Sequence, residues 1–387
     1  MKLFVPRESR NNETRVAVSV DTVKKLVGHG FDVAIEKSAG GYSGVLDQDY
    51  KDAGAKTATA KSAAEADVVL KVLRPTAAEA KKYKKGALVL AMMDPYGNEK
   101  EVAAIASSGV SSFAMEFMPR ITRAQVMDVL SSQANLAGYQ AVVEGAAEYN
   151  RAMPMMMTAA GTVPAAKVFV MGAGVAGLQA IATARRMGAI VTATDVRPAA
   201  KEQVESLGAK FVAVEDDEFK QAETAGGYAK EMSKEYQAKQ AELVASHIAK
   251  QDIVITTALI PGRPAPRLVS KAMVQSMAPG SVLVDLAVER GGNVEGAQAD
   301  KIAKVGDASI VGHTNMQGRI AASASLLYAK NLLAFLETML DKEKGGLNVD
   351  WEDELVQATL LTHGGKVVHP NFAKAEKTAS GKQKKNS

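Results

Sequence analysis

The sequence predicts an α/β fold built on parallel sheets that carry helices on both faces, and three observations support this. Short apolar runs alternate with helical segments from the start of the chain. A second strand–helix alternation begins at Lys167 and continues to about Gly312. Two long helical segments, 122–149 and 323–340, flank that second alternation. The chain has 387 residues, enough for two or three domains, so each alternation is expected to form its own domain.

The first alternation shows start and stop signals around its elements. Asp21 is expected to cap a helix over 22–27, and Gly109 is expected to follow a helix over 99–107. The expected strands are 3–5, 31–35, 68–70, 87–91 and 110–115. This unit is expected to end near Pro119 and Arg120.

The two flanking helical segments suggest that the second alternation is inserted into the first. The predicted domains are therefore 1–128 together with 322–387, and 129–321. The pattern leaves open the alternative that the C-terminal part is a separate appendage.

Charge and composition exclude several classes of protein. The net charge of +4 comes from 373–387, because without that segment the chain has 42 basic and 42 acidic residues. A balanced body argues against nucleic acid as a partner. We expect the tail 373–387 to be disordered in water, and weak attraction to an anionic membrane surface is the alternative.

The chain has no cysteine, which rules out disulfides and cysteine-based metal sites. Proline and charge come too early in the first eight residues for a secretory signal. The uncharged run 168–184 contains three central glycines, so it fits strand, turn and helix better than a membrane span. No paired metal-ligand spacing is found, and the chain is expected to be soluble, cytoplasmic and without a metal site.

The run GAGVAG at 172–177 predicts a dinucleotide-binding loop. A short apolar strand over 168–171 precedes it and a helix over 178–187 follows it. Gly172 would permit the tight turn, Gly174 would let backbone amides approach a diphosphate, and Gly177 would let helix and strand pack closely. The N-terminus of the helix would attract the phosphates.

Asp195 ends the next expected strand, 23 residues after Gly172. A carboxylate at that place accepts hydrogen bonds from the adenosine ribose and repels a 2′-phosphate, so NAD(H) is favoured over NADP(H). Arg197 tempers this preference because it could meet a 2′-phosphate. Stacking on adenine and exposure to solvent are its alternatives.

The long polar stretch 215–250 exceeds an ordinary connection in such a sheet. A pair of surface helices joined at Gly226 and Gly227 and a mobile lid with Tyr228 at its tip are equally favoured interpretations. Among the five histidines, only His313 follows a strand where a nucleotide cleft would open. The sequence thus offers a hydride cofactor without an obvious proton-transfer group.

Three features together resemble the alanine dehydrogenase and nicotinamide nucleotide transhydrogenase family. The first is PRE at 6–8 followed by ETRVA at 13–17, and the second is the glycine loop with its helix. The third is the set of stretches PRITRAQVMDVLSSQANLAGYQAV, MTAAGTVPAAKV, ETAGGYAKEM, TTALIPGRPAP and VDLAVERGGN. These stretches are closest to the transhydrogenase branch, and the likeness extends to about His369.

This resemblance implies two Rossmann-like domains, the first discontinuous, linked by long helices, with NAD(H) in the cleft and two copies forming a homodimer. It further implies a partner component that binds NADP(H), a membrane domain that passes protons, and a peripheral place at the inner face of the membrane.

The resemblance also implies which residues contact the nucleotides. The matching nicotinamide-site residues are Arg120, Gln125, Asp128 and Ser131, with Gln125 reaching toward the second nucleotide. Their spacing would let the last three share one helical face. The remaining nucleotide contacts that it implies are Val175, Val196, Arg197, Gly227, Tyr228, Gln240 and Leu259.

The sequence also departs from the dehydrogenase branch. Alanine dehydrogenases have a catalytic histidine in the segment that matches 87–95, where this chain has Met92 and Met93. Arg15, Lys71 and Asp285 remain at positions of the dehydrogenase active site, and we expect structural roles for them. The missing histidine fits hydride transfer between two nicotinamides. An NAD-dependent alanine dehydrogenase and a regulatory NAD-sensing protein are the alternative functions.

Overall fold

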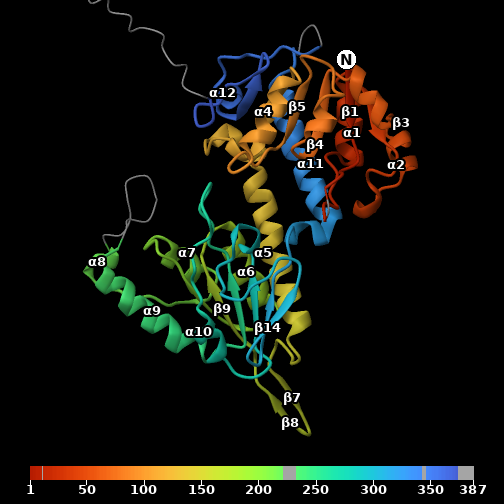
Figure 1. Cartoon of the computed structure of the whole chain (residues 1–387). Coiled ribbons are helices and arrows are strands. Elements are labelled where there is room, and N and C mark those ends of the chain that lie inside the picture. The colour runs from red at the N-terminus through yellow and green to blue at the C-terminus, as the bar shows by residue number, and fades with distance from the viewer. Residues whose placement is uncertain (11, 221–231, 342–345, 374–387) are drawn as a thin grey trace, which may run out of the picture. The chain divides into compact units, whose positions relative to one another are not determined.

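The structure, a computed structural model, describes residues 1–10, 12–220, 232–341 and 346–373. Contacts divide the chain into two compact units. Unit 1 comprises Met1–Glu8, Val16–Val129 and Tyr328–Ser387, and unit 2 comprises Ser9–Arg15 and Leu130–Leu327. Each unit is an α/β domain with a mainly parallel sheet, which confirms the predicted fold class (Figure 1).

In unit 1, the described residues form an eight-stranded sheet that is parallel except near one edge, where β16 runs antiparallel to both of its neighbours, β6 and β17. The strands in spatial order are β17 (Lys366–Val367), β16 (Leu360–His363), β6 (Ser111–Ala114), β5 (Leu88–Met92), β4 (Val68–Leu73), β1 (Lys2–Val5), β2 (Asp32–Glu36) and β3 (Lys56–Ala58). The helices are α1 (Val20–Gly28), η1 (Gly41–Ser43), α2 (Asp47–Asp52), η2 (Ala60–Glu65), α3 (Ala77–Ala80), α4 (Glu99–Ser107), η3 (Met115–Phe117), η4 (Thr122–Met127) and α12 (Glu354–Thr359). The strand pair β16–β17 at the edge has no counterpart in the sequence prediction.

The first helix begins earlier than the sequence indicates, and its cap is Ser19 rather than Asp21. The Ser19 hydroxyl accepts a hydrogen bond from the backbone N–H of Thr22, while Asp21 lies inside the first turn. An acidic residue in the first turn is stabilised by the helix dipole, which explains why Asp21 resembles a cap in the sequence.

In unit 2, the described residues form a seven-stranded sheet in the order β11 (Lys210–Phe211), β10 (Ile190–Thr194), β9 (Lys167–Met171), β12 (Ile253–Thr256), β13 (Val282–Asp285), β15 (Ala308–Val311) and β14 (Ile302–Val305). Only the edge strand β14 is antiparallel. The chain crosses from β9 to β10 on one side and returns to β12 on the other, so the strand order reverses beside β9. In open α/β sheets, ligands bind at such a switch point.

The helices of unit 2 include α6 (Val175–Arg186), α7 (Ala200–Ser206), α8 (Asp217–Lys220), α9 (Lys234–Ile248), α10 (Lys271–Gln275), η5 (Val288–Arg290) and η6 (Met316–Ile320). The long helices α5 (Val129–Glu148) and α11 (Ala321–Glu337) lie where the chain changes unit. In the stretch 215–250, α8 and α9 are present, and 221–231 lies outside the described residues.

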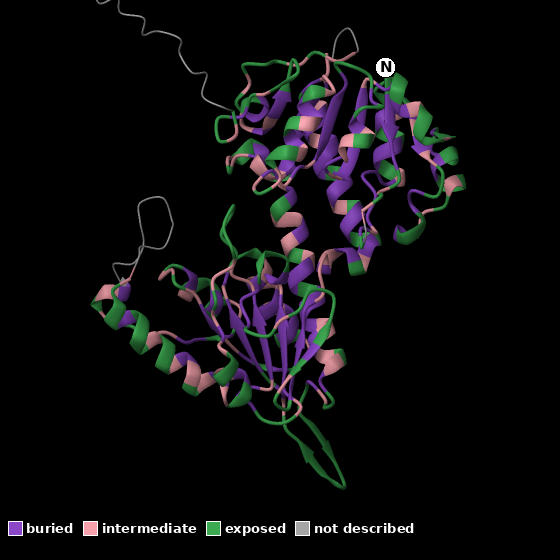
Figure 2. Ribbon diagram, in the orientation of Figure 1, coloured by how far each residue is buried: buried purple, intermediate pink, exposed green. Residues whose placement is uncertain are grey.

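Along a strand, alternate residues pack in different apolar clusters, as expected for sheets that are covered on both faces. In β1, Leu3 and Val5 pack in one cluster and Phe4 packs in another. In β9, Val168 and Val170 pack on one face, and the neighbouring residues pack on the other. The central strands of both sheets are accordingly buried (Figure 2).

The expected continuous helix over 122–149 is interrupted. The 3-10 helix η4 ends at Met127, Asp128 has an extended backbone with ψ of 93°, and α5 begins at Val129. Aspartate competes with the helix backbone for hydrogen bonds and favours positions just before a helix, which explains the break. Gln125, Asp128 and Ser131 therefore do not share one helical face.

A two-stranded hairpin, β7 (Met156–Thr158) and β8 (Gly161–Val163), also belongs to unit 2. All residues of both strands are exposed. Among the described residues, no helix is long and apolar enough to span a membrane.

Candidate functional site

The predicted glycine loop lies at the carboxyl edge of the unit 2 sheet, beside the switch point. It joins β9 to α6, and the loops after β10 and β12 adjoin it. Gly172 N–H donates to the carbonyl of Thr194 at 2.8 Å, and Thr257 N–H donates to the carbonyl of Met171 at 3.0 Å. The ends of three neighbouring strands are thus fixed around one short turn.

Two of the three glycines in the loop have a spatial requirement in the structure. Gly172 has φ of +106°, and a Cβ there would lie 2.4 Å from Thr257 Oγ1. A Cβ on Gly177 would lie 1.7 Å from the carbonyl oxygen of Gly172, so only glycine allows the helix to approach the strand. A Cβ on Gly174 would meet nothing within 4 Å. The first and third glycines are needed by the fold, whereas Gly174 faces open space.

The N-terminus of α6 fits a phosphate group. Gly174 is the N-cap residue and supplies no side-chain hydrogen bond to the first turn. The first N–H groups of a helix lack partners within the helix, and they carry the positive end of its dipole. Together with the open space at Gly174, this end of α6 can hold a diphosphate.

The Asp195 carboxylate lies directly beside this loop and is almost completely buried. One of its oxygens, Oδ2, accepts a hydrogen bond from the backbone N–H of Ala173 at 2.7 Å. The carboxylate is therefore tied to the middle of the glycine loop, at the position expected for a ribose acceptor.

Arg197 donates the other hydrogen bonds that the Asp195 carboxylate accepts. Its Nε donates to Asp195 Oδ1 at 2.9 Å and its Nη2 donates to Oδ2 at 3.0 Å, while its own backbone N–H donates to Oδ1 at 2.9 Å. A carboxylate accepts about four hydrogen bonds, and Asp195 makes four. A ribose diol could bind Asp195 only after the guanidinium moves.

Further predicted residues surround the same edge. Gln240 donates through Nε2 to Thr194 Oγ1 at 3.3 Å, and its Oε1 accepts from the backbone N–H of Val214 at 2.9 Å. Large apolar side chains are exposed here: Val175 in the first turn of α6, Val196 after β10 and Leu259 after β12. Exposed apolar groups around a polar centre suit the flat face of a base. Gly227 and Tyr228 lie outside the described residues.

The residues assigned to the nicotinamide by resemblance lie on one stretch of chain that crosses from unit 1 to unit 2. Arg120, Gln125 and Asp128 belong to unit 1, and Ser131 belongs to the first turns of α5 in unit 2. Arg120 and Gln125 are exposed, and Asp128 and Ser131 are half-buried. Their joint role stays a prediction.

The residues shared with the dehydrogenase active site are engaged in ion pairs or hydrogen bonds. Arg15 is buried and pairs with Glu13 at 2.7 Å, and buried Lys71 lies 3.1 Å from Glu8. Asp285 is fully buried and accepts hydrogen bonds from backbone N–H groups, including that of Val294 at 2.9 Å. These contacts give all three residues a structural role.

His313, the histidine singled out by its position after a strand, lies beside a carboxylate. Its Nε2 lies 3.7 Å from Glu144 Oε2. Although burial raises the pKa of Glu144, hydrogen bonds from Arg319 and Gln140 hold it below its usual value. Among the described residues, no group of His, Asp or Glu is arranged to hold a metal ion.

Three residues that support the loop were missed by the sequence analysis. Thr257 Oγ1 donates to the Gly172 carbonyl at 3.1 Å, and fully buried Asn293 braces the next residues through hydrogen bonds to Ala258. Gly138 on α5 lets that helix touch α6, since its Cβ would lie 2.0 Å from the Ala176 carbonyl. Only the position of Thr257, directly after β12, could have indicated a role.

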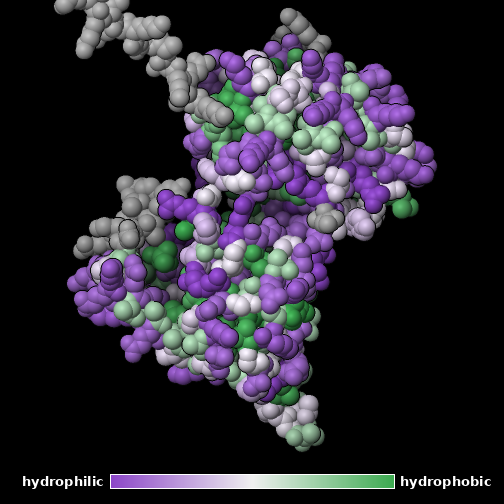
Figure 3. Space-filling view, viewed as in Figure 1, coloured by the Kyte–Doolittle hydropathy of each residue, from purple (hydrophilic) through white to green (hydrophobic). Residues whose placement is uncertain are grey.

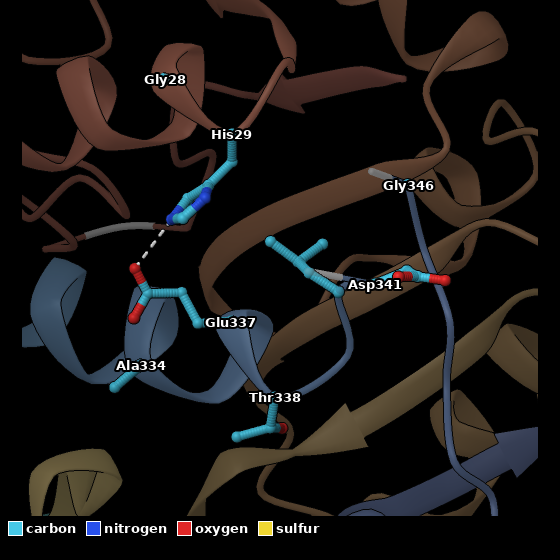
Figure 4. Close-up of a pocket in the computed structure, with 8 residues that line it drawn as sticks. Gly28, His29, Ala334, Glu337, Thr338, Asp341 and Gly346 are labelled. Carbon is cyan, nitrogen blue, oxygen red and sulfur yellow. Dashed lines mark hydrogen bonds and ion pairs between the residues drawn. The ribbon is translucent and has the colours of Figure 1, made fainter. Parts of the chain in front are cut away.

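A separate cavity of about 800 Å³ lies in unit 1, between the ends of α1 and α11. His29 and Glu337 meet across it, with 2.9 Å between His29 Nε2 and Glu337 Oε1 (Figure 4). Its lining contains none of the predicted nucleotide contacts.

Comparison with known proteins agrees with this geometry. Residues 4–137 match the family described as "Alanine dehydrogenase/PNT, N-terminal domain", and residues 141–370 match its C-terminal domain. The chain is 54% identical over 377 residues to the first part of the NAD(P) transhydrogenase alpha subunit of Rhodospirillum rubrum, covering 96% of this chain and 98% of the relative. It is 30% identical over 386 residues to an alanine dehydrogenase of Staphylococcus haemolyticus, covering 97% of this chain and 96% of that protein.

Solved structures show the same two likenesses. The crystal structure of a transhydrogenase from Sinorhizobium meliloti superimposes with a TM-score of 0.88 at 66% identity, over 95% of this chain and 100% of the other. An L-alanine dehydrogenase superimposes with a TM-score of 0.78 at 26% identity, over 96% of this chain and 98% of the other.

Proposed function

The chain belongs to the alanine dehydrogenase/PNT family, and from this premise we propose that it is the NAD(H)-binding component of a proton-translocating transhydrogenase. The similarity to transhydrogenase alpha subunits supports a transhydrogenase component. In the proposed reaction, hydride passes directly between NAD(H) bound here and NADP(H) bound by a partner component.

The observation that carries the proposal is the pairing of an open glycine with a fixed carboxylate. Gly174 leaves space at the N-terminus of α6 for a diphosphate, and Asp195 lies beside it on the Ala173 N–H. The carboxylate would bind a ribose diol and repel a 2′-phosphate, which favours NAD(H). Val175, Val196, Leu259 and Gln240 would surround the adenosine end, where Arg197 would become available once it leaves Asp195.

The nicotinamide supplies the hydride, and the chain's residues only have to hold it in place. We assign Arg120 and Asp128 to ordering the nicotinamide region, Ser131 to contacting it, and Gln125 to the second nucleotide. Hydride transfer between two nicotinamides moves no proton at the reacting carbons. Position and exclusion of water are therefore the requirements, and a neutral amide such as Gln125 meets the first of them.

The absence of a histidine from the segment 87–95 supports transhydrogenation over amino-acid oxidation. Met92 ends β5, Met93 follows it, and Met93 is fully buried. An amine or alcohol dehydrogenase needs a group that accepts the proton, and a buried thioether cannot do so.

The decisive experiment is stopped-flow oxidation of NADH with and without a purified NADP(H)-binding component. We expect hydride transfer only when both proteins are present, and NADH binding far tighter than NADPH binding to this chain alone. Preferential binding of NADPH would refute the assignment of the nucleotide.

An alanine dehydrogenase is the second candidate, favoured by the 26% identical structure and by retention of Arg15 and Lys71. Pyruvate- and ammonia-dependent oxidation of NADH by this chain alone would establish it. The ion pairs of Arg15 with Glu13 and of Lys71 with Glu8 argue against a free oxoacid site. A regulatory NAD sensor would instead bind NADH and stay inactive with a competent partner.

We further propose a homodimer that attaches to the inner face of the membrane through the partner's membrane domain. The β7–β8 hairpin supports the dimer, because an isolated two-stranded hairpin is marginally stable in water. The exposed side chains at the hairpin include Met155, which directly precedes β7, and Met156, Met157 and Val163 within the strands. The hairpin shows pale and green tones in Figure 3. Replacing these four residues by serine should shift the chain to monomers in sedimentation, and an unchanged dimer would place the interface elsewhere.

A further inference from the structure

The short helix η4 carries Gln125. Its opening hydrogen bond, from the Ala124 N–H to the Ile121 carbonyl, is 3.0 Å long, and its closing bond is longer. A 3-10 helix has poorer hydrogen-bond geometry than an α-helix. No side chain caps η4, and the bond that closes it, from the Asp128 N–H to the Gln125 carbonyl, is 3.4 Å long. The position of Gln125 must therefore be fixed by contacts to other elements.

The inner side of η4 is held by the core of unit 1. Ala124 and Met127 are buried in the same apolar cluster as Leu355 and Val356 of α12. Apolar contacts of this kind are not directional, so they keep the helix on the core without fixing its rotation or its sliding.

Two directional contacts lie on either side of Gln125. Asn331 of α11 donates through Nδ2 to the carbonyl of Val126 at 2.7 Å. On the other side, the Arg123 guanidinium forms a double hydrogen bond with Asp353, with Nη1–Oδ2 at 2.9 Å and Nη2–Oδ1 at 3.0 Å. Arg123 Nε also donates to Glu354 Oε1 at 3.1 Å.

Asp353, the main carboxylate partner of Arg123, is itself fixed. Asp353 is the N-cap of α12 and accepts from the backbone N–H of Leu355 at 2.7 Å, while Leu355 is fully buried. Hydrogen bonds from Arg123 hold the pKa of Asp353 below its usual value, so Asp353 is ionised at neutral pH. A planar guanidinium bound by two carboxylates has a defined orientation, unlike most surface ion pairs.

We propose that the clamp formed by Arg123, Asp353 and Glu354 positions Gln125 for hydride transfer, with Arg123 as a positioning residue that contacts neither nucleotide. This inference rests on the proposed function. An exposed ion pair contributes little to stability, but a displacement of about 1 Å in a reacting group can slow a reaction about a hundredfold. Loss of the clamp should therefore affect the rate far more than the fold.

The test compares Arg123→Gln, Asp353→Asn and the double variant in single-turnover hydride transfer with the NADP(H)-binding partner at saturating nucleotide. We expect each single variant to be about 10- to 100-fold slower, with the NADH dissociation constant changed less than about threefold. The double variant should be no slower than the slower single variant, because the residues act as a unit. Arg123→Lys keeps the charge but not the double hydrogen bond, so its rate of hydride transfer should lie between those of the wild type and Arg123→Gln.

Lys56→Gln is the matched control, because it breaks an exposed ion pair of similar length, Lys56–Asp32 at 2.8 Å, elsewhere in unit 1. Its rate should equal that of the wild type. A rate for Arg123→Gln within twofold of the wild type would overturn the inference, as would an equal loss of NADH affinity and rate. Wild-type protein that transfers no hydride with a competent partner would overturn the proposed function itself.

Discussion

Substitution of Gly174 by alanine separates the role of the glycine loop in folding from its role in binding. Gly174 has φ of −76° and ψ of −169°, an extended backbone that alanine adopts without strain. The added Cβ would meet nothing within 4 Å in the free protein. In the proposed complex, the same atom would lie where the backbone must approach the diphosphate.

The substitution is expected to have opposite effects on stability and on NADH affinity. Replacing glycine by alanine at a compatible position stabilises a protein by about 0.4–1 kcal/mol, because the unfolded chain loses conformational freedom. We therefore expect an unchanged or slightly higher melting temperature. A hydrogen bond to a charged group contributes about 1.5–3 kcal/mol, so loss of one amide–phosphate contact should weaken NADH binding about 10- to 100-fold.

The assay is NADH titration by fluorescence, paired with thermal unfolding of each variant. Gly28→Ala is the matched control, since its Cβ would also meet nothing within 4 Å and it lies in α1 of unit 1. Gly177→Ala should instead unfold at a lower temperature, because its Cβ would lie 1.7 Å from a carbonyl oxygen. Normal NADH affinity in a folded Gly174→Ala variant would show that the diphosphate binds elsewhere.

Three further predictions concern single side chains. Asp195→Ala should weaken NADH binding about 10- to 100-fold through loss of the ribose acceptor, and an unchanged dissociation constant would remove Asp195 from the nucleotide site. Gln125→Asn should leave NADH affinity within about threefold while hydride transfer slows about a hundredfold, and equal losses would make it an ordinary NADH contact. Glu116 should lower stability as pH rises: burial raises its pKa to about 7 from 4.5, so the folded state binds the extra proton between these values. Its contribution to the free energy of unfolding is present below about pH 4.5 and lost by about pH 7. The melting temperature of Glu116→Gln should therefore change less with pH, between about pH 5 and 8, than that of the wild type. An equal dependence of the melting temperature on pH in both proteins would contradict this.

Much of the fold follows from local signals in the sequence. The helix over 99–107 has the predicted bounds, because it is defined by an apolar pattern with breakers at its ends. The prediction of a continuous helix over 122–149 was wrong in one respect, since Asp128 interrupts an otherwise continuous pattern. The short strands β16 and β17 were not predicted, because strands of so few residues show no clear periodicity in the sequence.

The glycine loop and Asp195 could be placed from the sequence alone, because a turn between a strand and the next helix involves residues close in the chain. The sequence alone could not predict that α5 approaches α6 closely at Gly138, or that Ser9–Arg15 groups with unit 2. The same holds for the clamp on η4, where Arg123 and Asp353 lie 230 positions apart. Such contacts depend on the order of strands in the sheet and on which helices pack beside them, so only the tertiary structure decides them.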